Sequence, residues 1–206
     1  MATATPPALR QLGAGLRTFL ALTVVLGLIY PLAMTGIAQV LFRGNADGSL
    51  IESGGTVVGS ELIGQDFAGD PQYFQSRPSA AGDGYDPLSS SASNYGPENA
   101  ELVALVEERR AAVAELDGVE AGRVPPDALL ASGSGLDPHI SPAYAEQQVA
   151  RVARERGLDP AQVRRLVDES TQGRAFGFLG EAGVNVLVLN IALNALSANA
   201  QAADSE

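Results

Sequence analysis

The feature that most constrains this chain is an uncharged segment of 25 residues, Thr18 to Phe42, which lies between Arg17 and Arg43. At about 1.5 Å per residue, a helix of this length reaches roughly 37 Å, more than the roughly 30 Å hydrocarbon core of a bilayer. The apolar region of a cleaved signal peptide is only ~7 to 15 residues long, and no clear small-x-small cleavage site follows this segment. The sequence therefore predicts a single transmembrane helix over residues 18–42.

Pro31 lies in the middle of this span and removes one helical hydrogen bond. In lipid, the freed carbonyl needs a partner from a neighbouring helix or from a local rearrangement. Pro31, Thr35 and Gly36 together suggest packing against other membrane helices. An isolated, kinked anchor explains the same residues equally well.

The distribution of charge predicts the orientation of the helix. Arg10 and Arg17 precede the span without any acidic residue, whereas ten arginines and all 24 acidic residues follow Arg43, giving that part a formal charge of −14. By the positive-inside rule we expect a cytoplasmic N-terminal arm over residues 1–17 and a soluble extracytoplasmic domain over residues 43–196. The tail, residues 197–206, has little to bury, and we expect it to be disordered.

Composition excludes several function classes. The chain has no cysteine and no lysine, its 13 basic residues all being arginine, and a formal net charge of −11. Disulfides, thiolate nucleophiles, lysine general bases and the phosphate-binding lysine of a P-loop are therefore excluded. Nucleic acid is not an expected partner, because neutralising phosphates requires a basic face.

The pattern after the span predicts one α+β domain. Apolar runs around Gly54-Gly55 predict a hairpin, and the polar segment 66–95 predicts a loop that has room for a short strand at YFQSRP. Three helices are expected, at 97–116 with an Asn94 cap, at 142–156 between Ser141 and Gly157, and at 160–170 with a capping box of Asp159 and Gln162. In VNVLVLNIAL, residues 184–193, strand and helix compete, and we favour a strand first.

The chain's single histidine, His139, lies in SGSGLDPHISP, residues 132–142. A serine, His139 and Asp137 within so few residues cannot easily converge as a catalytic triad, and the sequence lacks the G-x-S-x-G elbow. One His with scattered carboxylates gives no metal-ligand spacing, although carbonyl binding of a hard ion stays open.

A phosphate cradle has more physical support than a triad. Ser132, Gly133, Ser134 and Gly135 could present backbone amides ahead of a helix N-terminus, which is why we take them as a candidate phosphate or interface loop. We favour a structural interpretation, with glycines at positive φ, a turn at Asp137-Pro138, and His139 satisfying buried backbone groups.

A second glycine-rich stretch, GRAFGFLGE at residues 173–181, fits no dinucleotide or Walker spacing. We expect Phe176 and Phe178 to dock this turn onto the core.

Several motifs occur in order over about residues 27–194 and resemble one family: YPLAMTGIAQVLF, VVGSELIGQDF, YFQSRPSA, SSASNYGP, ASGSGLDPHISPAYAEQQVARVA and TQGRAFGFLGEAGVNVLVLN. The chain is identified by them as a member of the C chains of Kdp-type high-affinity potassium-transporting ATPases. Arg43 stands where that family often has proline, and the N-terminal arm and the tail match nothing in it.

This resemblance implies a non-catalytic accessory subunit, single-pass in the cell inner membrane, without a cofactor of its own. It implies partners, a potassium-translocating A chain and an ATP-hydrolysing B chain, so that ATP and potassium are ligands of the complex. The family is described as stabilising the complex and as a catalytic chaperone that supports ATP binding by the pump subunit. A membrane-anchored exported hydrolase and a stand-alone binding module are the alternatives.

Overall fold

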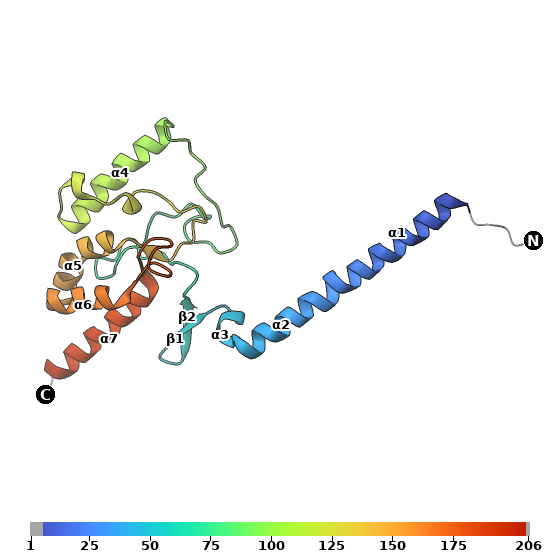
Figure 1. Cartoon of the computed structure of the whole chain (residues 1–206). Helices are drawn as coiled ribbons and strands as arrows, with labels where there is room; N and C mark the ends of the chain where they lie inside the picture. Colours follow the sequence, from blue (N-terminus) through green and yellow to red (C-terminus); the bar gives the residue numbers. More distant parts are fainter. Residues whose placement is uncertain (1–5, 205–206) are drawn as a thin grey trace, which may run out of the picture. The chain divides into compact units, whose positions relative to one another are not determined.

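The computed structural model describes residues 6–204, which form two compact units, one up to Leu50 and one from Ile51 onward (Figure 1). The first unit is the helix that the uncharged segment predicts, with α1 at Pro7–Val24, a π-helical turn η1 at Val25–Ile29 and α2 at Tyr30–Leu41. This 35-residue apolar helix buries none of its most hydrophobic window inside the protein. It is long and apolar enough to cross a membrane.

The helix begins at Pro7, so most of the expected N-terminal arm is helical, and residues 1–5 lie outside the described part. The π-helical turn ends immediately before Tyr30-Pro31, and the Tyr30 N–H bonds to the carbonyl of Val25, five residues earlier. Because Pro31 has no N–H to donate, a widened turn here relieves the conflict between its ring and the preceding turn. A short helix, α3 at Arg43–Ala46, follows the span.

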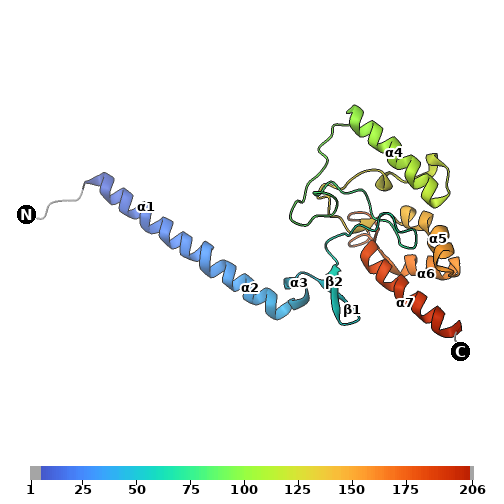
Figure 2. The ribbon, with the colours of Figure 1, turned by 180° about the vertical axis from the view of Figure 1, so that it is seen from behind.

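The second unit is an α+β domain with two small sheets, which confirms the expected fold class (Figure 2). Strands β1 at Leu50–Ser53 and β2 at Thr56–Ser60 form the expected hairpin around Gly54-Gly55, both at positive φ. The other sheet has the antiparallel order β3-β5-β4, from His139–Ile140, Gly183–Asn185 and Thr171–Gln172. His139 pairs with Asn185, and Thr171 pairs with Val184.

Helices α5 at Pro142–Arg156, α6 at Pro160–Ser170 and α7 at Val186–Asp204 pack against β5 of this sheet, and α4 at Ala100–Asp117 packs against α5. Two 3-10 turns, η2 at Ala121–Arg123 and η3 at Pro126–Ala128, connect α4 to the candidate loop. In Figures 1 and 2, α5 and α6 lie between α4 and α7. The core forms where these helices meet β5, and its fully buried members include Val152, Val163, Val184, Leu189 and Leu193.

The bounds of α5 and α6 agree with the sequence prediction because their caps act locally. Ser141 Oγ accepts from the Tyr144 N–H, and Gly157 ends α5 in the left-handed conformation. At α6 the expected capping box is wrong in detail. Asp159 Oδ1 accepts from the Ala161 N–H, and the Gln162 N–H bonds to the Asp159 carbonyl instead.

The predicted cap of α4 is also wrong. Asn99, not Asn94, accepts from the N–H groups of Glu101 and Leu102, so the helix begins three residues later than expected. Asn94 instead has φ +55 and donates to the Ala92 carbonyl. Pro97 therefore lies in the turn before the helix.

The stretch at residues 184–193 begins as strand, as we favoured, but only through Asn185, and it continues as helix from Val186. β5 ends at Asn185, whose Oδ1 accepts from the Val188 N–H and so caps α7. Leu189 and Leu193 recur at helical spacing and are fully buried. The helix continues to Asp204, so the tail expected to be disordered is helical through that residue.

YFQSRP, residues 73–78, does not form a strand, because side chains take its backbone groups. Asn190 accepts from the Phe74 N–H at 2.9 Å and donates to the Phe74 carbonyl at 3.0 Å. Gln148 makes the same pair of contacts with Gln75, at 2.6 and 3.3 Å. Helices α7 and α5 therefore clamp this extended segment in the way that neighbouring strands would.

Candidate functional site

Hydroxyls of the loop Ser132–Gly135 bond two amides of the same turn. Ser132 Oγ accepts from the Gly135 N–H at 2.9 Å, and Ser134 Oγ accepts from the Leu136 N–H at 3.1 Å. A phosphate cradle requires amides that point at the ligand. Two of the amides in this turn are occupied by hydroxyls of the same turn.

The outward-facing carbonyls of the loop hold the long segment 79–91. The Ser134 carbonyl accepts from the Ser91 N–H and the Ser90 hydroxyl, and the Gly135 carbonyl accepts from Ser79 Oγ at 2.6 Å. Gly135 has φ +69, and a Cβ on it would lie 2.5 Å from the Ser91 carbonyl oxygen. The glycine is thus required both by its conformation and by this close approach.

The N-terminus of α5 already has an anion beside it. The Asp127 carboxylate accepts from the Ser141 N–H at 2.6 Å and from the Ser141 hydroxyl at 2.9 Å. This carboxylate lies where the helix dipole favours negative charge, so it occupies the position that an external phosphate would take.

His139 does not act as the sequence analysis expected. Its ring is 37% exposed, and its Nδ1 lies 3.3 Å from Asp137 Oδ1, so it contacts a carboxylate and not buried backbone groups. Asp137 also pairs with Arg77 at 3.0 Å and caps its own turn by accepting from the His139 N–H. The Ser141 hydroxyl donates to Asp127 and not to His139, so Ser141 and His139 do not form the nucleophile–base pair of a catalytic triad.

Two hollows flank this region. One, of about 390 Å³, is lined by His139, by the carboxylates of Asp127, Asp137 and Glu181, and by Arg77, which is paired with Asp137. We call it the acidic hollow. Among the described residues, no group of three or more His, Cys, Asp or Glu side chains has the arrangement of a metal site. The hollow therefore offers negative charge and not a ligand set.

The second hollow, of about 410 Å³, lies between α4 and residues 66–85 and is lined by Arg109, Tyr85 and Tyr144. Burial raises the pKa of Tyr85 to about 12, and burial also raises the pKa of Tyr144. Both phenols are therefore neutral at physiological pH. The Tyr85 hydroxyl donates to the Arg77 carbonyl, which fixes this tyrosine as a wall of the hollow.

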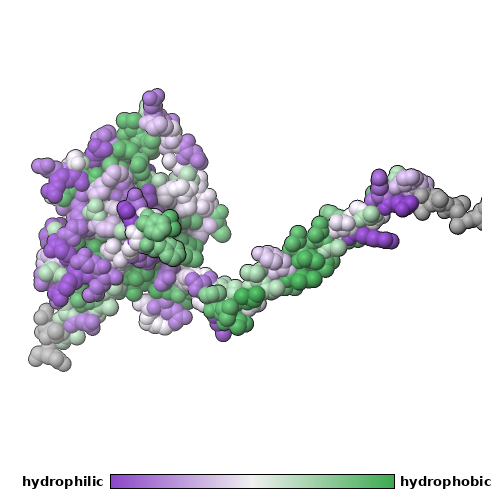
Figure 3. Space-filling view, viewed as in Figure 1, coloured by the Kyte–Doolittle hydropathy of each residue, from purple (hydrophilic) through white to green (hydrophobic). Residues whose placement is uncertain are grey.

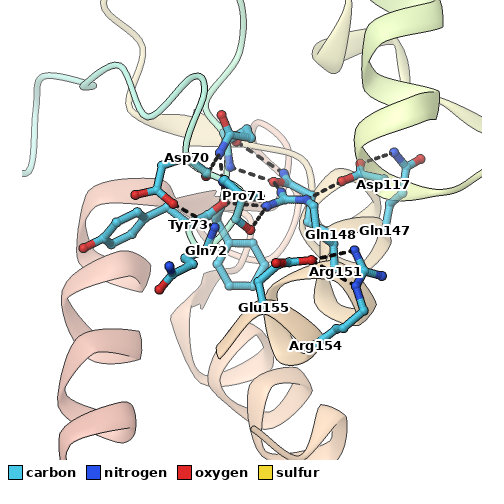
Figure 4. A network of polar contacts seen from close by, with 12 residues as sticks. Asp70, Pro71, Gln72, Tyr73, Asp117, Gln147, Gln148, Arg151, Arg154 and Glu155 are labelled. Atoms are coloured by element: carbon cyan, nitrogen blue, oxygen red, sulfur yellow. Dashed lines mark hydrogen bonds and ion pairs between the residues drawn. The ribbon is translucent and has the colours of Figure 1, made fainter. Parts of the chain in front are cut away.

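The largest fully buried side chain among the described residues is that of Arg151, which was not predicted from the sequence (Figure 4). Its Nε donates to Asp117 at 2.8 Å, with both side chains 1% exposed or less. Its other nitrogens donate to Gln148 and to the carbonyls of Pro71 and Tyr73. The pair therefore joins the end of α4, the middle of α5 and the clamped segment.

The signal for this residue was its spacing in the sequence. Tyr144, Gln148 and Arg151 follow one another at four and three residues, which places them on one face of α5. That face is the buried one. A charged residue on a buried face requires a partner, but sequence does not say which carboxylate supplies it.

The predicted docking of Phe176 and Phe178 onto the core is wrong. Their side chains are 88% and 72% exposed, and Leu179 beside them is 51% exposed. The turn they occupy closes on itself through backbone bonds, so it does not need the core to hold its shape.

These observations define a class: a membrane-anchored chain with one apolar helix and one α+β domain, whose candidate loop is tied up by internal hydrogen bonds. Residues 12–195 match the family model described as "KdpC: K+-transporting ATPase, c chain". The chain belongs to this KdpC family. It is an accessory subunit of that ATPase and not its catalytic chain.

Similar proteins cover nearly the whole chain. A potassium-transporting ATPase KdpC subunit of Kineococcus radiotolerans is 57% identical over 193 residues, or 94% of this chain and 97% of the relative. The KdpC subunit of Rhodospirillum rubrum is 54% identical over 90% of this chain and 96% of its own length. That of Mycobacterium tuberculosis is 49% identical over 91% and 99%.

Proposed function

We propose that this chain stabilises a potassium-import complex in the cell inner membrane, together with a potassium-translocating A chain and an ATP-hydrolysing B chain. The observation that carries the proposal is the match of the chain to the KdpC family together with its one long apolar helix in the described part. The amides of Gly135 and Leu136 are bonded to loop hydroxyls, and Asp127 accepts from the Ser141 N–H at the start of α5. Purification of the chain from native membranes tests it. We expect two larger membrane chains in stoichiometric amounts, and recovery of this chain alone would refute it.

The soluble domain in this proposal faces the outside of the cell. Support comes from the two arginines before the span and the formal charge of −14 after Arg43. Protease treatment of sealed vesicles tests the side. We expect cleavage of the domain in right-side-out vesicles and protection in inverted ones, and the reverse result would refute the orientation.

A domain on the outside of the cell does not contact cytosolic ATP. It therefore supports ATP binding only by allosteric coupling through the membrane helices. Such couplings usually change affinity by a factor of about 5 to 150. The assay is the KM for ATP of the complex assembled with and without this chain, and we expect a higher KM without it. An equal KM would refute the role in supporting ATP binding, but it would not bear on the role in stabilising the complex.

We assign the loop Ser132–Gly135 to holding the segment 79–91 at a subunit interface, and not to holding a nucleotide phosphate. The assignment is supported by its internally bonded amides. Gly133 has open space around it, so Gly133→Glu places a charge there without a clash. We expect an unchanged KM for ATP in the Gly133→Glu complex. A large increase would indicate a phosphate site.

The acidity of the domain has a second consequence in this orientation. A domain with a formal charge of −14 raises the local concentration of cations, and this field decays over about 8 Å at physiological salt. Neutralising exposed carboxylates should weaken potassium uptake at low ionic strength. An unchanged apparent affinity for potassium would refute this contribution.

A further inference from the structure

The loop between α6 and α7 presents an aromatic tip, which we define as Phe176, Phe178 and Leu179. Their side chains are 88%, 72% and 51% exposed. Figure 3 shows a hydrophobic patch with hydrophilic surroundings on the face of the soluble unit where Figure 1 draws this loop. Single exposed apolar residues are ordinary, but clustered exposed aromatics mark interaction sites.

The backbone of the tip is rigid. Phe176 has φ +53, an unusual value for a bulky residue, and the glycines at 177 and 180 also have positive φ. The Gly177 N–H bonds to the Arg174 carbonyl at 3.0 Å, and the Leu179 N–H bonds to the Ala175 carbonyl at 2.9 Å. The turn therefore fixes the backbone from which the two phenyl rings project into water.

Neither the positive φ of Phe176 nor the exposure of the two phenyl rings stabilises the isolated domain. A non-glycine residue held at positive φ costs roughly 1 to 3 kcal/mol, and the exposed rings bury little surface in return. A preorganised aromatic pair does, however, reduce the entropy lost on binding, and aromatic residues dominate binding energy at protein interfaces. The geometry therefore suits a docking element.

The charge around the tip distinguishes between two possible occupants. One basic residue, Arg174, precedes the tip, while Glu181 follows it. Glu181 lines the acidic hollow with Asp127 and Asp137, and Arg77 in the same hollow is paired with Asp137, so carboxylates outnumber cations there. A bilayer surface that carries anionic lipid favours elements rich in lysine and arginine, which this chain lacks here. A protein groove with apolar walls and a nearby cation matches both the rings and the carboxylates.

We propose that the aromatic tip docks into an apolar groove on the extramembrane surface of another subunit of the transport complex, beside a basic residue that faces the acidic hollow. This inference rests on the proposed function, because it requires that the chain assembles with other subunits. It adds the surface through which the soluble domain contacts its partner and the chemistry of the partner's site.

The test is a variant with Phe176→Asn and Phe178→Asn, because asparagine tolerates positive φ and removes the ring. The matched control is Leu62→Ser, which removes an apolar side chain that is 63% exposed in a different loop and lies outside the segment 79–91. Full-length chains are expressed with the other subunits, and the amount of complex recovered in mild detergent is measured against wild type. Thermal unfolding of each isolated chain in detergent reports on folding.

We expect the yield of complex with the double asparagine variant to fall at least tenfold, with no loss of thermal stability, and Leu62→Ser to behave as wild type. Normal assembly of the double variant refutes the docking role. If the double variant assembles normally but protease cleaves its domain faster than the wild-type domain in liposomes, the tip contacts the bilayer, which also refutes the docking role. If the wild-type chain itself recovers no partner, the proposed function fails before the tip is tested.

Discussion

The buried pair of Arg151 and Asp117 gives the sharpest prediction, because neither side chain is more than 1% exposed. Asp117→Asn keeps the size of the side chain and removes its charge, which leaves the guanidinium without a counter-ion. Two unit charges about 4 Å apart interact by about 4 kcal/mol at an effective dielectric constant of ~20. Breaking a buried pair on one side costs about 3 to 5 kcal/mol in the free energy of unfolding.

For a domain of this size, each kcal/mol shifts the Tm by about 2 to 4 °C, so we expect a Tm lowered by roughly 6 to 20 °C. The assay is thermal unfolding of the full chain in detergent, followed by circular dichroism at 222 nm. The matched control is Glu146→Gln, which breaks the ion pair with Arg164 that is 2.7 Å long but about half exposed on both sides. Exposed pairs contribute about 0 to 1 kcal/mol, so this variant should unfold within about 4 °C of wild type.

The reasoning is refuted if Asp117→Asn unfolds at the wild-type temperature, or if Glu146→Gln is equally damaging. The first result would mean that water or a rearranged neighbour compensates Arg151. The second would mean that distance alone, and not burial, sets the energy of an ion pair in this domain.

Three further predictions concern the loop, the tyrosines and the clamp. Gly135→Ala should destabilise the domain by about 1 to 3 kcal/mol, because its Cβ would clash at positive φ, whereas Gly133→Ala, in open space, should be near neutral in chemical denaturation. Because burial raises the pKa of Tyr85 to about 12, its contribution to stability is fully present below pH 10 and is lost as pH rises toward 12. Tyr85→Phe should flatten that decline in the urea midpoint, and an unaltered profile would contradict the assignment. Asn190→Ala should cost about 2 to 4 kcal/mol by leaving two buried backbone partners unpaired, and Asn194→Ala, on the exposed face of α7, less than about 0.5.

Where local chemistry decided the structure, the sequence was a sufficient guide. The apolar span was evident from 25 uncharged residues, because the bilayer imposes a length that few other structures share. The limits of α5 followed from Ser141 and Gly157, whose caps act within one turn. The hairpin at Gly54-Gly55 is equally local, because only those two residues need positive φ there.

Partners distant in the chain decided the rest. The pattern left a short strand open at YFQSRP, and none forms because Asn190, 116 residues away, bonds to the backbone of Phe74. The run after Asn185 became a helix because burial of its leucines outweighed the β-propensity of its valines. Arg151 is buried because the fold brings Asp117 to it across 34 residues.

The sequence by itself therefore determined the membrane span, the class of domain and the family, since each depends on composition, spacing or motif order within short stretches. Tertiary structure alone decided three other features. The amides of Gly135 and Leu136 bond to hydroxyls of the serine–glycine loop, and the Asp127 carboxylate lies at the N-terminus of α5. The phenyl rings of the α6–α7 loop face water. Hydrogen bonding and burial depend on which segments meet in space, and that information lies outside any local pattern.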